Sequence, residues 1–262
     1  MQLTEVTSAA TAKDFIQVNV LINKGNPNYI RPLDNEVDEV FDTEKNKHAK
    51  YGETKRWILK NVQGKLIGRI AAFTYSKYIN KGTEFATGGI GFFDCTNDQS
   101  AANQLFNAAK EWLQNKGMEA MDGPINFGDR DKWWGLMVEG FNKEPMYGMP
   151  YNPPYYAQLF DGYGFQNYYN QYWYSMGVDD KLPERFAERY AKFKAKPGYE
   201  ARHIDIKNPE QHADEFATVY NAAWAQHGEA KEITKEQAIK LFNKMKAIMD
   251  PRLVWFAYYK EE

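Results

Sequence analysis

Residues 117–165 read GMEAMDGPINFGDRDKWWGLMVEGFNKEPMYGMPYNPPYYAQLFDGYGF, and this stretch decides how the rest of the chain is interpreted. It concentrates glycine, proline, asparagine, tryptophan and tyrosine more than any other region. Ordinary core packing needs fewer turn-forming residues and fewer amphipathic aromatic side chains than this. Irregular segments of this kind typically carry binding residues on a rigid scaffold, so we interpret the stretch as the wall of a site.

A predicted strand and helix lead into this wall. Residues 87–95, TGGIGFFDC, form the strand, and its glycines indicate a bulge or a close approach by a ligand or a neighbouring backbone. Thr96-Asn-Asp-Gln99 matches a capping box, which predicts the start of a helix that runs to residue 116. Apolar residues follow at helical spacing along it.

The remaining patterns predict alternating strands and helices on both sides of the wall. The predicted elements are a strand at 2–6, helices at 11–24 and 36–41, strands at 55–61, 65–77 and 118–121, and a further aromatic strand at 171–176.

The C-terminal part repeats the order of the N-terminal part. Residues 179–197 are charged and are predicted to form a linking helix. A strand at 199–206, helices at 211–224 and 234–249 and a strand at 253–259 then match the strand–helix–helix–strand order of residues 1–61. The sequence therefore predicts a mixed α+β domain at 1–178, a linker, and the first half of a similar unit at 198–262.

The last predicted strand is too apolar for a free edge. Residues 253–259 read LVWFAYY, and an unpaired strand of this composition invites association. We therefore expect either a truncated second unit or a strand that docks on another sheet or chain, such as a homodimer formed through the C-terminal unit.

Composition argues against several classes of function. The net charge is −2, with 33 basic and 35 acidic residues, whereas nucleic-acid binding through phosphate contacts favours a basic excess. One cysteine excludes an internal disulfide, and the four histidines lack metal-ligand spacing, so no metal is expected. No run approaches the roughly 18 apolar residues of a membrane span. We expect a cytoplasmic protein without a nucleic-acid or membrane partner.

The chain resembles the GCN5-related N-acetyltransferase (GNAT) superfamily in element order and local motifs. The motifs are Gly88-Gly-Ile-Gly-Phe-Phe93, Asp122-Gly-Pro-Ile-Asn126, Trp134-Gly-Leu-Met-Val-Glu-Gly-Phe141, Tyr151-Asn-Pro-Pro-Tyr-Tyr156 and Gly164-Phe165. The resemblance covers residues 1–178 and implies a mixed, mostly antiparallel sheet flanked by helices, with residues 198–262 resembling a partial second unit of this kind. It also implies an acyl-CoA donor, an amine acceptor on a small molecule or peptide, and two strands that part to admit the donor.

The family's donor site maps incompletely onto this sequence. Its Gln/Arg-x-x-Gly-x-Gly/Ala loop corresponds to residues 99–104, QSAANQ, where Ala102 and Gln104 depart from the pattern and the Asp98 carboxylate opposes an anion. The residues implied for acyl-CoA are Phe93, Asp94, Cys95, Gln99, Ser100 and Ala101. Cys95 also fits a buried small hydrophobic residue.

The implied catalytic residues depart from the family as well. Phe160 stands where the family has a tyrosine that acts as the general acid, and phenylalanine has no proton to give. The leaving thiolate must therefore be protonated by Tyr156, Tyr155 or water. Asp122 is a candidate general base, although the position after a strand and before Gly-Pro equally fits a turn residue.

The wall supplies the candidate residues for the acceptor. They are Asn126, Trp133, Trp134, Tyr151 and Asn152. Asn126 also fits a turn, and we expect one tryptophan to pack and the other to line the groove. Residues 129–131, DRD, fit either a helix start or a grip on a charged substrate.

Three functions remain open from the sequence. The first is an acyl-CoA-dependent N-acyltransferase. The second is a GNAT-like protein that binds a ligand or partner without catalysis, favoured by Ala102, Gln104 and Phe160. The third is a Fem-like aminoacyl transferase, which would explain the poor pyrophosphate loop.

Overall fold

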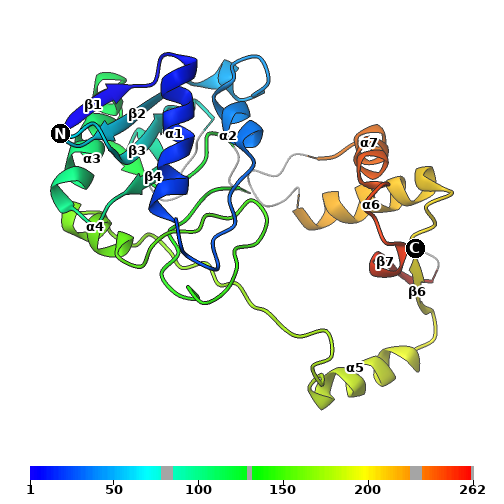
Figure 1. Cartoon of the computed structure of the whole chain (residues 1–262). Coiled ribbons are helices and arrows are strands. Elements are labelled where there is room, and N and C mark those ends of the chain that lie inside the picture. Colours follow the sequence, from blue (N-terminus) through cyan, green and yellow to red (C-terminus); the bar gives the residue numbers. More distant parts are fainter. Residues whose placement is uncertain (78–84, 129–131, 225–231, 261–262) are drawn as a thin grey trace. The chain divides into compact units, whose positions relative to one another are not determined.

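The computed structural model describes residues 1–77, 85–128, 132–224 and 232–260. The Asp-Arg-Asp motif at 129–131 therefore lies outside the described residues. The chain divides into two compact units, Met1–Gln171 and Tyr172–Glu262, and each is described by itself. Figure 1 shows their elements. Among the described residues, no helix is long and apolar enough to cross a membrane.

The first unit is built on a five-stranded sheet in the order β1-β2-β3-β4-β5. The strands are β1 (Gln2–Glu5), β2 (Thr54–Lys60), β3 (Leu66–Phe73), β4 (Thr87–Cys95) and β5 (Ala120–Asp122). Consecutive strands pair antiparallel from β1 to β4, and β5 alone pairs parallel, with β4. The predicted mixed, mostly antiparallel sheet is confirmed.

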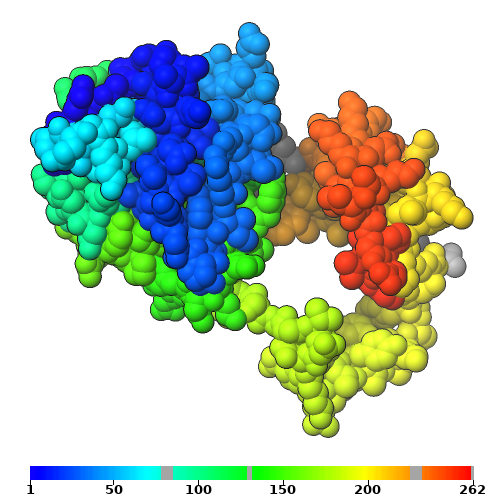
Figure 2. Space-filling model, in the orientation of Figure 1, coloured from blue at the N-terminus to red at the C-terminus, as the bar shows by residue number. Residues whose placement is uncertain are grey.

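Helices cover both faces of this sheet. Helices α1 (Ala9–Ile22) and α2 (Asp34–Phe41) lie over one face, where Phe15 packs with Ile58 and Ala71. Their side chains close over that face in the space-filling view (Figure 2). Helices α3 (Gln99–Asn115) and α4 (Tyr156–Tyr163) pack on the opposite face. Strand β3 is apolar along almost its whole length, and successive side chains point to opposite faces, so it supplies both layers.

A bulge in β4 reverses the direction of its side chains. Arg69 pairs with Asp94 and Ala71 with Gly91, so β4 carries one residue more than β3 between these positions. The extra residue lies at Phe92, whose φ of 49° is left-handed. Because a one-residue shift exchanges the two faces, Asp94 lies on the α1 face beside Arg69, while Phe93 and Cys95 face α3.

Strands β4 and β5 part after a short parallel ladder. They pair only at Thr87, Gly88 and Gly89 of β4, and Ile125 N–H then donates to the Ile90 carbonyl at 2.8 Å. The neighbouring backbone explains the glycine at position 91, because a Cβ there would lie 2.0 Å from the Ile125 oxygen. The last residues of β4 therefore have an edge that β5 does not cover.

The second unit repeats the strand–helix–helix–strand order of the first. It contains α5 (Glu184–Lys194), β6 (Tyr199–His203), α6 (Pro209–Trp224), α7 (Lys235–Met245) and β7 (Trp255–Tyr259). Strands β6 and β7 pair antiparallel, as β1 and β2 do. A small core of Ile204, Ala213, Ala238 and Phe242 holds it together. Short 3-10 helices occur at Ala49–Tyr51 and Pro251–Leu253.

Two sequence-based expectations about elements were wrong. The aromatic segment 171–176 is not a strand: its side chains are exposed and it pairs with no described strand. β propensity alone does not make a strand without a partner. The helix after β4 is not opened by the predicted capping box at Thr96. Asp98 is its N-cap and accepts hydrogen bonds from the N–H groups of Ser100 and Ala101.

Candidate functional site

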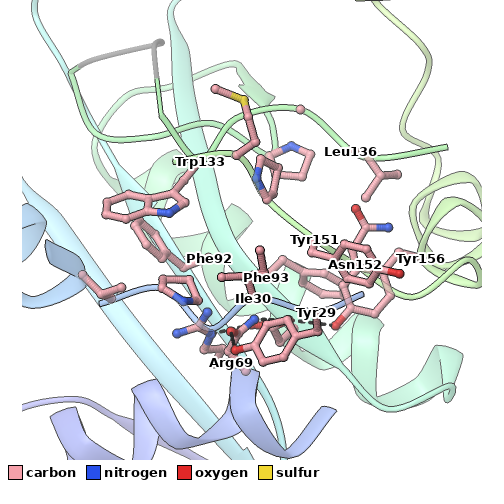
Figure 3. A pocket seen from close by; sticks show the side chains of 18 residues that line it. Tyr29, Ile30, Arg69, Phe92, Phe93, Trp133, Leu136, Tyr151, Asn152 and Tyr156 are labelled. Atoms are coloured by element: carbon pink, nitrogen blue, oxygen red, sulfur yellow. Dashed lines mark hydrogen bonds and ion pairs between the residues drawn. The ribbon is translucent and has the colours of Figure 1, made fainter. Parts of the chain in front are cut away.

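A cavity lies at the β4 bulge, where side chains from both faces of the sheet meet. Its eighteen lining residues come from α1, α2 and the segment between them, from β3 and β4, from the irregular segment after β5 and from the start of α4 (Figure 3). We call it the bulge cavity. Tyr29 and Arg69 lie at one end, and Trp133 and Leu136 lie opposite. Its free space is about 70 Å³, which is room for roughly two water molecules.

The polar end is organised by a buried ion pair. Arg69 Nε donates to Asp94 Oδ2 at 2.7 Å, and the two side chains are 6% and 4% exposed. The guanidinium also donates to the Phe15 carbonyl at 3.1 Å and lies over the Phe15 ring. A buried carboxylate needs such a partner, because leaving it unpaired in an apolar interior is very costly.

Asn19 and Tyr29 extend this network toward the cavity. Asn19 Nδ2 donates to both oxygens of Asp94 at 3.1 and 3.0 Å, and its Oδ1 accepts from the Tyr29 hydroxyl at 2.6 Å. Burial, and then the negative charge of Asp94, raise the pKa of Tyr29 to about 12. Tyr29 is therefore a neutral hydroxyl at ordinary pH. It donates its proton in a hydrogen bond to Asn19 Oδ1, and its oxygen keeps lone pairs that can accept hydrogen bonds.

Two adjacent tyrosines occupy the open edge of β4. Cys95 N–H donates to the Tyr156 hydroxyl at 3.0 Å, and the Tyr155 hydroxyl donates to the Cys95 carbonyl at 2.8 Å. The Tyr156 hydroxyl in turn donates to Asp94 Oδ1 at 3.0 Å. The strands do part as the resemblance implies, but side chains of α4 and the residue before it fill the opening.

This geometry weighs against Tyr156 as a proton donor. The side chain is 1% exposed and its proton is held by Asp94. Burial and the Asp94 charge raise the pKa of Tyr156 well above its usual value. Burial likewise raises the pKa of the half-buried Tyr155 to about 12. Both hydroxyls support the backbone of Cys95, and burial raises the pKa of the Cys95 thiol to about 12.

The opposite end of the cavity is aromatic and aliphatic. The rings of Phe92 and Trp133 lie 5.6 Å apart, and both residues have left-handed backbone, with φ of 49° and 46°. Such conformations cost about 1–3 kcal/mol each in non-glycine residues and gather at functional sites. Gly148 accepts a hydrogen bond from Trp133 N–H at 2.6 Å, which ties the two arms of the irregular segment together.

Tyr151 and Asn152 anchor that segment. Asn152 accepts from Met137 N–H at 2.9 Å and donates to the Met137 carbonyl at 3.1 Å. The Tyr151 hydroxyl donates to the Phe141 carbonyl at 2.8 Å. Two buried side chains thus hold an irregular wall against the sheet, so their polar atoms serve the wall and their remaining surfaces face the cavity.

The first turn of α3 is already satisfied by the protein. The Asp98 carboxylate accepts from Ser100 N–H at 2.9 Å and Ala101 N–H at 3.4 Å, while Gln99 Nε2 donates to the Leu159 carbonyl at 3.1 Å. An anion at this helix start would have to displace Asp98 and face its charge. The pyrophosphate of a coenzyme A ester does not fit this turn as it stands.

The structure brings together part of the predicted site. Phe93, Asp94, Trp133, Tyr151, Asn152 and Tyr156 all line the bulge cavity. The predicted residues outside its lining are Cys95, Gln99, Ser100, Ala101, Asp122, Asn126, Trp134 and Tyr155.

Four of those outside residues have clear positions. Asp122 ends β5 opposite Gly89. The buried Asn126 accepts from Phe127 N–H through its Oδ1, and Tyr155 donates to the Cys95 carbonyl. Trp134 packs on Tyr169, so Trp133 is the tryptophan that lines the cavity.

Sequence reasoning missed Asn19, Tyr29 and Arg69. A signal was present for Arg69, since it is the single charge inside the apolar strand LIGRIAAF. An arginine in a strand buried on both faces needs a buried acidic partner, and Asp94 in β4 meets that need. Asn19 and Tyr29 carry no comparable local signal.

The chain is similar in part to a solved acetyltransferase structure and to two curated proteins. The aminoglycoside 6'-N-acetyltransferase structure from Acinetobacter haemolyticus is similar over 68% of this chain and 100% of its own, at 14% identity and a TM-score of 0.42. At that score the likeness carries no functional argument. The element order from β1 to α4, however, is the order that the GNAT resemblance implies.

Two curated proteins are similar in sequence. The chain is 26% identical over 258 residues to the bacterial ceramide synthase of Caulobacter vibrioides, which covers 98% of this chain and 66% of that protein. It is 30% identical over 154 residues to protein YghO of Escherichia coli K12, covering 58% of this chain and 38% of that protein. The chain thus spans less than two thirds of either relative. No family model matches it.

Proposed function

We propose that this protein is an N-acyltransferase that joins an acyl group from a thioester, acyl-CoA in the first instance, to the amine of a long-chain amino alcohol. The similarity to a ceramide synthase over 98% of the chain supports the reaction class and the acceptor. Ceramide is an amide formed between a fatty acid and a long-chain amino alcohol. The acceptor would therefore have a small polar head and a long apolar tail.

The amphipathic lining of the bulge cavity is the observation that carries the proposal. One end presents Tyr29 and Asn19, which hydrogen bonds join to the Arg69–Asp94 pair. The other end presents Phe92, Trp133 and Leu136. A polar head fits the first end and an alkyl chain the second. Binding sites commonly combine apolar walls with a few well-placed polar groups in this way.

The chemistry needs little from the protein besides position. The neutral amine attacks the thioester carbonyl, a C–N bond forms and the C–S bond breaks. The nitrogen loses one proton and the leaving thiolate gains one. The Tyr29 oxygen is placed to accept a hydrogen bond from the amine or a hydroxyl of the acceptor. The hydroxyls of Tyr155 and Tyr156 hold the Cys95 backbone at the end of β4.

Room for such a substrate requires movement of the wall. Free space of about 70 Å³ is far below the roughly 300–1,000 Å³ of ordinary ligand sites. The wall around Trp133 and Tyr151 is irregular, and a few hydrogen bonds anchor it, whereas the floor is a sheet strand. We therefore assign the opening motion to residues 132–152.

A thiol-release assay tests the proposal. The protein is incubated with acyl-CoA esters of increasing chain length and with either a long-chain amino alcohol, a short amino alcohol or a peptide amine. We expect acceptor-dependent thiol release only with the long-chain amino alcohol. Release that is equal for the short amino alcohol, or no release with any pair, contradicts it.

One observation favours the second function, binding without transfer. The Cys95 backbone and the first turn of α3 are both engaged by the protein's own side chains, Tyr155, Tyr156 and Asp98. If these contacts persist, a long-chain amine would bind without any thiol release. Calorimetry with the amino alcohol alone, run beside the assay, separates the two functions.

A further inference from the structure

Helix α5 carries an aromatic stripe along one side. Phe186, Tyr190 and Phe193 are spaced four and three residues apart, which places them on one face of a helix. Their exposed fractions are 45%, 66% and 52%. We call these three residues the α5 stripe. Phe193 also contacts Tyr199 of β6, with ring centroids 5.7 Å apart, so the stripe continues to the start of that strand.

Basic side chains border this stripe and acidic ones lie away from it. Residues 184–196 contain five basic and two acidic side chains, a net charge of +3, although the whole chain carries −2. Arg185 lies over the Phe186 ring, Lys194 over Tyr190 and Lys196 over Phe193. By helical spacing, Glu184 and Glu188 fall on the opposite side.

This arrangement differs from that of an ordinary solvated helix. A solvated helix keeps its apolar stripe against the core, whereas every residue of α5 is exposed. Aromatic residues on one face, with lysine and arginine along its borders, are typical of helices that lie in a membrane interface. Their rings enter the headgroup region while the cations meet anionic lipid.

We propose that α5 docks this protein on the surface of a bilayer containing anionic phospholipid. The α5 stripe enters the interface, and Arg189, Lys194 and Lys196 contact lipid phosphates and other anionic headgroup oxygens. The charge complementarity of the +3 segment 184–196 on a −2 chain selects this occupant over a neutral apolar partner. The contact is peripheral, and it requires neither donor nor acceptor, so it stands apart from the proposed reaction.

Vesicle co-sedimentation of the full chain tests this. The probes are phosphatidylcholine vesicles and vesicles of phosphatidylcholine with phosphatidylglycerol, at low and high salt. We expect the protein to bind anionic vesicles at least tenfold more strongly than neutral vesicles. High salt should weaken the binding to anionic vesicles. Equal binding to both kinds of vesicle, or to neither, overturns the proposal.

Two variants locate the binding surface. Replacing the α5 stripe by serine is expected to lower partitioning at least tenfold. A second variant combines Arg189→Gln, Lys194→Gln and Lys196→Gln. We expect it to lower partitioning onto anionic vesicles roughly 100-fold. Both sets change only exposed side chains, and circular dichroism checks that the fold is retained.

The matched control removes the same charge from another exposed helix face. This control replaces three exposed lysines by glutamine: Lys240 and Lys244 of α7, and Lys246, its C-cap. We expect this variant to bind within about twofold of the parent. An equal loss in the control, or a stripe variant that binds as well as the parent, overturns the assignment to α5. The assignment is also overturned if the parent chain self-associates but does not bind vesicles, and if only the stripe variant abolishes that self-association.

Discussion

Arg69 Nε lies 2.7 Å from Asp94 Oδ2 inside the first unit, and the two residues meet on the α1 face because a bulge at Phe92 turns Asp94 toward it. The pair fixes the polar end of the bulge cavity. It also carries the hydrogen bonds that lead to Tyr29 on one side and to Tyr156 on the other.

Breaking this pair from one side will destabilise the protein strongly. Arg69→Met leaves Asp94 buried without a cation, and we expect a loss of about 3–5 kcal/mol in the free energy of unfolding. Lys116→Met, which breaks an exposed pair with Glu53, is the control and should cost less than about 1 kcal/mol. Urea titration of both variants measures the two losses in the free energy of unfolding. Similar losses would show that the buried pair stabilises the fold no more than an exposed pair does.

Tyrosine ionisation will report the buried network. The fold raises the pKa of Tyr156, so its contribution to stability is complete below the unfolded pKa of about 10 and is lost as pH rises above it. Tyr156→Phe should therefore make the fall in stability above pH 10 less steep. An unchanged slope would mean that Tyr156 ionises as freely in the folded protein as in the unfolded chain.

A partly buried tyrosine with a lowered pKa provides the opposite control. Hydrogen bonds from Lys77 and then Lys50 lower the pKa of Tyr51. In a tyrosinate absorbance titration, Tyr51→Phe should remove an early-ionising group, whereas Tyr156→Phe should remove one that ionises only when the protein unfolds. If both variants lost absorbance in the same pH range, Tyr51 and Tyr156 would not differ in pKa as the structure indicates.

The sequence was sufficient for the order of elements from β1 to β5 and for part of the site. Strand composition located β2, β3 and β4, helical spacing located α3, and turn-rich composition located the wall with Trp133, Tyr151 and Asn152. The pairing of Arg69 with Asp94 was not predictable, because it depends on the β4 bulge, and a bulge is set by register with the neighbouring strand.

The residues that fill the opening were also out of reach. Tyr155 and Tyr156 were proposed as acids from their place in the chain, but their hydroxyl partners on Cys95 are about sixty residues away. The strand expected at 171–176 had the right composition, yet strand formation requires a partner strand, which no local pattern specifies.

The wall should set the preference for acceptor length. Trp133→Ala removes a large apolar surface from the cavity, and we expect the KM for a long-chain amino alcohol to rise roughly tenfold, with a smaller change in kcat. Trp134→Ala, which alters the neighbouring tryptophan outside the cavity, should leave KM within about twofold. Equal effects of the two substitutions would place the acceptor elsewhere.

The cap of α3 should limit the affinity for coenzyme A. Asp98→Ser keeps an N-cap oxygen and removes the negative charge, so we expect the Kd for coenzyme A to fall about threefold or more. The expected effect on an acyl-pantetheine, which lacks the pyrophosphate, is small. Calorimetry with both ligands tests this, and an unchanged Kd for coenzyme A would show that its phosphates do not approach α3.

The proposed transfer is tested most directly by mass spectrometry of the product. Isotope-labelled acyl-CoA and a long-chain amino alcohol are supplied to the protein, and the labelled amide and the released thiol are both counted. Transfer in the bulge cavity predicts one labelled amide for each thiol. At acceptor concentrations well below KM, Trp133→Ala should lower the rate roughly tenfold, whereas Trp134→Ala should change it little. Thiol release without the labelled amide, or no turnover of either kind, would contradict it.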